Sequence, residues 1–175
     1  MNATSLDASP LTADAFRPFG DVLEAAGAAD MIINGGRCDR FHDRARLTFG
    51  SGRAGISVFR SNAVSLPFRL EVMERHPIGS QAFLPMTDAP YLVVVAGDVS
   101  GRPGPPKAFL AAPDQGVNYL AGTWHAPLLA LKEGAAFAVV DRIGNGENLE
   151  EMTLAEPVFI SAEWRAFFGR DSATA

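Results

Sequence analysis

Short apolar runs alternate with clusters of glycine and proline through most of the chain. The runs are rich in branched and aromatic residues and cover residues 55–60, 68–74, 90–96, 107–110, 116–120, 128–131 and 136–142. Many short strands at such spacing favour a β-sandwich or barrel. Because none of these runs is followed by a long periodic helix, a parallel α/β sheet is disfavoured. We therefore predict an all-β protein whose body spans residues 20–157.

Other local signals complete this picture. Residues 91–95 are apolar without alternation, which predicts a strand buried on both faces. Residues 97–106 form a long loop rich in glycine and proline, and residues 132–135 form a compact turn. Thr12 is placed to cap a short helix that carries Phe16, and a second short helix around Trp164 is expected to close at Gly169.

Length, charge and cysteine content narrow the class of protein. A chain of 175 residues is expected to form one domain, residues 1–175. Its net charge of −5 argues against nucleic-acid binding, and its single cysteine excludes an intrachain disulfide. The first ten residues show no signal-peptide pattern, and no apolar run is long enough to span a membrane. We expect a cytoplasmic protein that binds neither nucleic acid nor membranes.

The most informative segment is residues 68–85. Phe68, Leu70 and Val72 share one parity, and this parity continues to Glu74 and His76. An apolar strand face would therefore end in a carboxylate and an imidazole at the mouth of a barrel, where small-molecule sites open. Gln81 follows after a short turn and is expected to return to the same mouth. The alternative is that the strand ends before Glu74, which leaves both side chains exposed.

Two other segments carry candidate site residues. Asn118 and Tyr119 end a strand before a turn at Gly122, and His125 follows beside a tryptophan. His125 is a candidate metal ligand or proton carrier, and the alternative is a turn histidine bonded to a backbone carbonyl. Arg40 and Arg44 flank a phenylalanine and a histidine; they form either a carboxylate-binding lip or a solvated loop.

The spacing of these groups resembles two cupin motifs. Glu74-x-His76-x4-Gln81 resembles the first motif, and the glycine three positions before His125 resembles the second. By this resemblance His76 and His125 match metal-binding histidines, Glu74 replaces another histidine and Gln81 replaces a carboxylate. Glutamate is a competent ligand, whereas a neutral glutamine binds metal more weakly.

Longer blocks resemble one branch of that superfamily, the ureidoglycolate lyase family. They include ERHP-xx-SQAF and GVNY-xx-GTWH-x-P, and the resemblance runs from about residue 11 to residue 160. It implies a double-stranded β-helix, that is, a cupin-like jelly-roll barrel with short flanking helices. It further implies cleavage of ureidoglycolate into glyoxylate and urea in allantoin breakdown, a homodimer, and a divalent metal, which is nickel in some members.

Such a cleavage needs a base, an acid and a clamp for the substrate carboxylate. We expect His125 or Glu74 to remove the hydroxyl proton, and His76 to hold the metal or polarise the nascent aldehyde oxygen. Arg40, Arg44 or Lys132 would bind the carboxylate, and Asn118, Tyr119 and Gln81 would bind the urea group. Two alternatives stay open: a hydrolase that releases ammonia from the same substrate, and a non-catalytic cupin that binds a small carboxylic acid.

Overall fold

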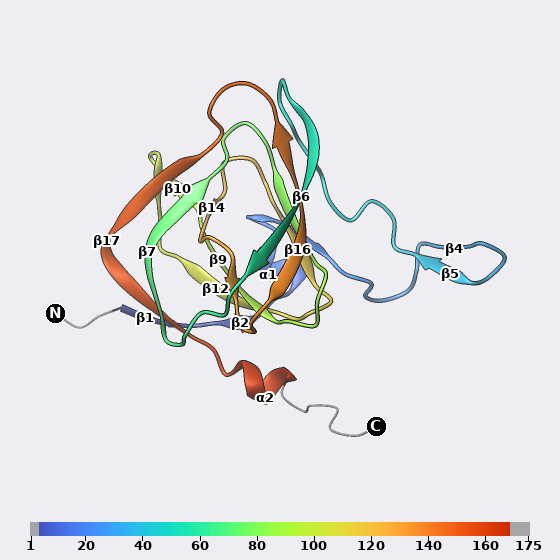
Figure 1. Ribbon diagram of the computed structural model, residues 1–175, viewed down its shortest axis with the longest axis horizontal. Helices are drawn as coiled ribbons and strands as arrows, with labels where there is room; N and C mark the ends of the chain where they lie inside the picture. The colour runs from blue at the N-terminus through green and yellow to red at the C-terminus, as the bar shows by residue number, and fades with distance from the viewer. Residues whose placement is uncertain (1–3, 169–175) are drawn as a thin grey trace.

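Two β-sheets face each other in the computed structural model, which describes residues 4–168 (Figure 1). The larger sheet has the order β1-β17-β7-β14-β9-β12-β2, with β15 also paired to β9. The smaller sheet has the order β3-β13-β8-β16-β6. β7 and β17 lie on one side of the barrel, and β6 and β16 lie on the other (Figure 1).

The strands are divided between the two sheets as follows. The larger sheet contains β1 (Thr4–Asp7), β2 (Ser9–Pro10), β7 (Phe68–Arg75), β9 (Tyr91–Ala96), β12 (Lys107–Ala111), β14 (Trp124–His125), β15 (Leu129–Ala130) and β17 (Glu150–Ser161). The smaller sheet contains β3 (Gly20–Leu23), β6 (Arg53–Ser61), β8 (Gln81–Pro85), β13 (Gly116–Tyr119) and β16 (Ala135–Ile143). Two hairpins, β4 (Met31–Ile33) with β5 (Cys38–Arg40) and β10 (Asp98–Val99) with β11 (Arg102–Pro103), and two helices, α1 (Ala13–Phe16) and α2 (Trp164–Phe168), complete the described chain.

Apolar side chains fill both faces of the central strand β9. Val93 and Val95 belong to the cluster between the two sheets, together with Phe83 and Phe137 of the smaller sheet. Leu92, Val94 and Ala96 belong to a second cluster on the outer face, which β17 and α2 help to cover. All six residues of β9 are buried, which confirms the prediction of a strand buried on both sides.

The sequence pattern predicted most of the architecture. Every predicted run overlaps an observed strand, and the all-β jelly-roll barrel with short flanking helices is confirmed. The Thr12 side chain caps α1 by accepting a hydrogen bond from Ala15 N at 3.3 Å. Gly169, expected to close the second helix, lies outside the described residues. Strand β17 was missed: it extends beyond the predicted body, and its polar residues and Pro157 obscure the alternation.

The alternation predicted along β7 was wrong in detail. Leu70 and Met73 both pack in the outer cluster although they are three residues apart, so the alternation breaks between them. The pairing of β17 with β7 also shifts register between Thr153 and Val158. The inward direction of Glu74 is therefore set not by Leu70 but by its cross-strand partner His125, which in turn pairs with Val95 of the inner core.

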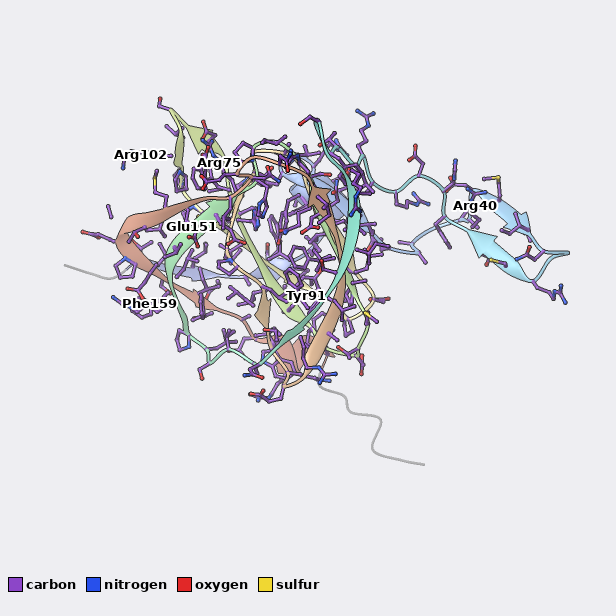
Figure 2. All side chains as sticks on the ribbon, turned by 45° about the horizontal axis from the view of Figure 1, so that its top comes forward. Arg40, Arg75, Tyr91, Arg102, Glu151 and Phe159 are labelled. Carbon is purple, nitrogen blue, oxygen red and sulfur yellow. The ribbon has the colours of Figure 1, made fainter. Side chains whose placement is uncertain are left out.

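The hairpin β4–β5 projects away from the barrel (Figure 1). It carries Arg40, whereas Arg75 and Tyr91 lie on the barrel itself (Figure 2). No helix within residues 4–168 has the length and apolar character needed to cross a membrane.

Candidate functional site

The structure brings Glu74, His76 and His125 together at one end of the barrel. One potential ligand atom of each lies within 4.8 Å of the others. His125 Nε2 is 3.4 Å from Glu74 Oε1, and the ring centroids of the two histidines are 5.3 Å apart. His125 is buried, and Glu74 and His76 are half-buried. The convergence predicted for these three side chains is confirmed, although their chemical roles stay proposals.

Backbone carbonyls orient both imidazoles. His76 Nδ1 lies 2.6 Å from the carbonyl oxygen of Asn148, and His125 Nδ1 lies 3.0 Å from that of Thr123. Since a carbonyl oxygen can only accept, each Nδ1 donates, and in the neutral ring each Nε2 keeps its lone pair. Both Nε2 atoms are buried and have no hydrogen-bond partner within residues 4–168. In its neutral form each ring therefore keeps an Nε2 lone pair, and the Nε2 atom of His125 lies 3.4 Å from Glu74 Oε1.

Local backbone features hold the two histidine segments together. Pro77 follows His76, and its ring prevents a further ladder hydrogen bond there. The turn into β14 passes through Gly122 at φ +82°, a conformation that glycine adopts without steric cost. Gly122 N donates to the carbonyl of His76 at 2.9 Å. The turn that carries His125 is thus tied directly to His76.

An ionic network on the outer face supports the same strands. Arg75 follows Glu74 in the chain and donates to Asp98 and Glu150, each at 2.7 Å. Its guanidinium lies 4.5 Å from the ring centroid of Trp124, the residue before His125, and Trp124 Nε1 donates to Asp98 Oδ1 at 2.9 Å. These contacts connect the chain neighbours of the paired residues Glu74 and His125. They restrict the relative movement of β7 and β14.

Neighbouring groups set the protonation states in the cluster. Burial alone would raise the pKa of Glu74, but the hydrogen bond from His125 and the positive charge that His125 and His76 carry when protonated outweigh it, and the pKa lies below its ordinary value. Glu74 is therefore a carboxylate at neutral pH. The ring of Tyr119 stacks on His125 at 4.2 Å with an interplanar angle of 11°. Burial, with the charge of Glu74, raises the pKa of Tyr119 well above its usual value, so its hydroxyl stays protonated.

The donor set fits a divalent metal ion. Two imidazole nitrogens and one carboxylate are a common ligand combination for zinc and other first-row metals. The unpartnered Nε2 atoms of His76 and His125 supply the observation that supports this fit, because buried ring nitrogens without partners are costly. Gln81 Oε1 is a further buried acceptor without a partner in the described part of the chain.

A cavity of about 510 Å³ opens beside the cluster. Glu74 and Gln81 contribute to its wall, and the other lining residues are Phe59, Arg60, Ser61, Phe83, Pro127 and Leu128. Gln81 thus returns to the mouth as predicted. Arg60 is the cation of this lining, and sequence reasoning missed it because it has the outward parity of an ordinary solvated strand residue.

Four predicted substrate-binding residues are not brought to this site in the described chain. Asn118 lies on the opposite face of β13 from Tyr119, and its buried amide donates to Asp21 and to the Arg46 carbonyl. The other three are Arg40, Arg44 and Lys132. The strand alternation that brings Tyr119 into the barrel necessarily turns Asn118 outward.

The cations Arg40, Arg44 and Lys132 have local partners elsewhere. Arg40 bonds to His42 on the projecting hairpin, and Arg44 forms an ion pair with Asp30 at 3.0 Å. Lys132 donates to the Asp88 carbonyl at 3.2 Å. It follows β15, which pairs with the Tyr91 end of β9, whereas His125 pairs with Val95.

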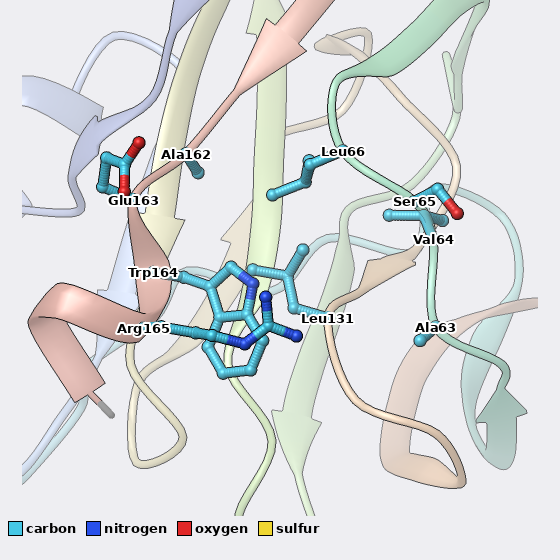
Figure 3. Close-up of a pocket in the computed structure, with 9 residues that line it drawn as sticks. All are labelled: Ala63, Val64, Ser65, Leu66, Leu131, Ala162, Glu163, Trp164 and Arg165. Carbon is cyan, nitrogen blue, oxygen red and sulfur yellow. The ribbon is translucent and has the colours of Figure 1, made fainter. Parts of the chain in front are cut away.

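A second cavity of about 500 Å³ lies between α2 and the segment before β7 (Figure 3). Its lining consists of Ala63, Val64, Ser65, Leu66, Leu131, Ala162, Glu163, Trp164 and Arg165. The guanidinium of Arg165 lies 4.6 Å from the Trp164 ring centroid. The lining of this cavity contains no histidine, in contrast to the cluster at the barrel mouth.

Comparison with known proteins identifies the family of this chain. Residues 3–161 match the family described as ureidoglycolate lyase. A ureidoglycolate lyase of Rhodobacter capsulatus is 52% identical over 152 residues, which cover 86% of this chain and 94% of the relative. One of Chelativorans sp. is 50% identical over 152 residues, covering 86% of this chain and 92% of the relative. One of Rhizobium etli is 50% identical over 157 residues, covering 89% and 95%.

Solved structures give more distant similarities. The rmlC epimerase of Mycobacterium tuberculosis has a TM-score of 0.40 at 17% identity and covers 57% of this chain and 50% of its own. ChmJ, a 3'-monoepimerase from Streptomyces bikiniensis, has a TM-score of 0.43 at 16% identity and covers 84% of this chain and 73% of its own.

Proposed function

The chain belongs to the ureidoglycolate lyase family, and we propose that it splits ureidoglycolate into glyoxylate and urea at the cluster of Glu74, His76 and His125. The observation that carries this assignment is the convergence of two buried imidazole Nε2 atoms on Glu74, whose side chain lines the cavity. These are the groups that a reaction with two proton transfers requires.

The reaction removes a hydroxyl proton and protonates a departing nitrogen. As the O–H bond breaks, its electrons form the carbonyl of glyoxylate, and the C–N electron pair leaves with the urea nitrogen. His125 Nε2 accepts the hydroxyl proton, and Glu74, 3.4 Å away, stabilises the imidazolium that forms. The imidazolium then donates the proton to the urea nitrogen. Acid–base catalysis of this kind contributes about 10²–10⁴-fold.

The substrate carboxylate needs a cation in the cavity wall. Arg60 supplies it, because it lines the cavity that Glu74 and Gln81 also line. A guanidinium binds a carboxylate in two places, which fixes both the position and the direction of the substrate. The negative charge of Glu74 repels the substrate carboxylate. The substrate carboxylate is therefore directed toward Arg60.

We propose a divalent metal, nickel among the candidates, as an additional component of the site. Glu74, His76 and His125 would hold it, and His125 Nε2 would then be a metal ligand in place of the proton acceptor described above. When bound, such an ion would lower the pKa of a substrate hydroxyl and stabilise negative charge on its oxygen. Elemental analysis of the purified protein tests this proposal, with about one ion per chain expected and a metal-free active enzyme as the contrary result.

Activity and its dependence on the site form the direct test of the proposed function. Purified protein incubated with ureidoglycolate is expected to release glyoxylate, and His125→Ala is expected to abolish most of this release. Absence of turnover by the wild-type protein, with and without added divalent metal, would refute the function. It would then favour a cupin that only binds a small acid.

We also propose a homodimer formed through the outer face of the smaller sheet. Ile56 and Val58 are 77% and 67% exposed there, and Leu84 and Met86 extend the apolar surface. The register places Val58 beside Ala138, and Ala138 beside Leu84, so these residues form one contiguous patch. Exposed contiguous apolar surface marks interaction sites. Sedimentation analysis is expected to give a dimer, and Val58→Glu a monomer; a monomeric wild-type protein would refute this proposal.

A further inference from the structure

The inner face of the smaller sheet carries a row of polar side chains at the level of His125. Tyr119 of β13 pairs with Gln81 of β8, and its ring stacks on His125. On the other side of β8, Ala82 pairs with Val140 of β16 in an antiparallel register. The next position along these strands brings Asp141 beside Gln81. One row across three strands therefore reads Tyr119, Gln81, Asp141.

Asp141 faces the barrel interior. Phe137 and Val139, which share its parity on β16, are both fully buried in the inner cluster. Val139 lies two residues before Asp141 and pairs with Phe83 of β8. Phe83 also belongs to the inner cluster. Asp141 thus replaces an apolar side chain where the core ends and the polar cluster begins.

Both Gln81 and Asp141 hold a buried acceptor without a donor. Gln81 Oε1 and Asp141 Oδ1 have no hydrogen-bond partner in the part of the chain that the structure describes. A buried acceptor left unpaired costs free energy, and an apolar residue at either position would avoid that cost. Two such acceptors on adjacent strands, facing one interior, indicate a ligand with two neighbouring donors.

We propose that Asp141 and Gln81 bind the ureido group of the substrate, with Asp141 Oδ1 and Gln81 Oε1 accepting its N–H donors. This inference rests on the proposed function and names the residues that select its substrate. A ureido group presents N–H donors on both nitrogens, and neighbouring acceptors match two of them. Asp141 is thereby a specificity-determining residue that sequence analysis did not identify.

The row also determines the orientation of the substrate. The carboxylates of Asp141 and Glu74 repel a carboxylate, while Arg60 in the cavity wall attracts it. The ureido end therefore points toward Gln81 and Asp141, and the carboxylate end points toward Arg60.

The test is a binding measurement that does not depend on turnover. N-carbamoylglycine carries the carboxylate and the ureido group but lacks the hydroxyl that cleavage requires, and glyoxylate lacks the ureido group. Calorimetric titration of the purified protein, with its metal content measured, compares Asp141→Leu and Asp141→Asn with wild type. The matched control is Asp114→Asn, an exposed aspartate in the turn before β13.

We expect Asp141→Leu to weaken N-carbamoylglycine about tenfold to a hundredfold, the range for a hydrogen bond to a charged group. Asp141→Asn keeps a neutral acceptor and should fall between Asp141→Leu and wild type. Glyoxylate affinity should change less than about twofold in every variant. The melting temperature of Asp141→Leu should equal or exceed that of wild type, because a buried unpaired acceptor is removed.

Two results would overturn the inference. One is wild-type affinity of Asp141→Leu for N-carbamoylglycine, and the other is an equal loss of affinity for both ligands with a lowered melting temperature. The second would assign Asp141 a structural role. Either result, obtained with a wild-type protein that cleaves ureidoglycolate, would leave the proposed function intact. Lack of cleavage by wild type would instead remove the function on which the inference rests.

Discussion

Glu74 and His125 face each other across two antiparallel strands, with Glu74 Oε1 3.4 Å from His125 Nε2. Glu74 and His125 form the residue pair of the ladder that joins β14 to β7. The same pairing therefore connects the strands and assembles the acid–base groups. Substitution of either side chain should therefore lower catalytic activity more than it lowers the stability of the fold.

The first prediction concerns the coupling of these two residues. Glu74→Gln and His125→Ala should each lower kcat/KM by about 10²–10⁴-fold. The kcat/KM of the double variant should be only slightly lower than that of the less active single variant, because the effects of groups that act as a unit are not additive. Steady-state kinetics of the four proteins measures this coupling, with His42→Ala on the projecting hairpin as the control. Losses that multiply in the double variant would show that the two act independently.

The second prediction concerns metal binding. His76→Ala should lower the affinity for a divalent metal by more than the roughly 10–100-fold that loss of an outer-shell partner costs. The reason is that Nε2 of His76 is an unpartnered potential ligand atom in the cluster. Titration calorimetry with nickel and with zinc on chelator-treated protein provides the measurement. Unchanged metal affinity in His76→Ala would show that the ion binds at a site that does not include His76.

The third prediction concerns Arg60. Arg60→Gln should raise KM about tenfold to a hundredfold with a much smaller effect on kcat, because the contact to the substrate carboxylate exists before and during the reaction. Arg53→Gln, on the same strand but without a place in the cavity lining, is the matched control. A wild-type KM in Arg60→Gln would show that another cation binds the substrate carboxylate.

The fourth prediction concerns pH and Asp98. The indole N–H of Trp124, the Gly101 amide and Arg75 outweigh desolvation and hold the pKa of Asp98 below its usual value. A lowered folded-state pKa stabilises the fold at pH values above the unfolded-state pKa of about 3.9, and this contribution disappears as pH falls through the lower folded-state value. Wild type should therefore melt above Asp98→Asn at neutral pH, and the two should converge below about pH 4. Calorimetric melting from pH 3 to pH 7, roughly the range around that pKa, measures the difference; a constant difference would exclude Asp98 as its source.

The sequence predicted the barrel because local alternation and turn residues determine short strands one at a time. It could not locate β17, whose pairing with β7 depends on a register shift that only the assembled sheet defines. For the site, the histidines and Glu74 were identifiable from motif spacing. Arg60 and Asp141 were not, because each occupies a position whose importance comes from a neighbouring strand distant in sequence.

The same limitation explains why some predicted substrate-binding residues lie away from the cluster. Asn118 and Tyr119 are adjacent in the chain, and a strand necessarily points them to opposite faces, so at most one could reach the site. Arg40, Arg44 and Lys132 were chosen by charge alone. Charge indicates what a residue can bind, whereas its place in the topology determines what it meets.

The ratio of products tests the central claim most directly. Purified protein is incubated with ureidoglycolate, and urea, glyoxylate and ammonia are quantified separately over the time course. We predict equal amounts of urea and glyoxylate, no ammonia, and loss of both products in His125→Ala. Ammonia in place of urea would contradict the account and make the enzyme a hydrolase acting on the same substrate.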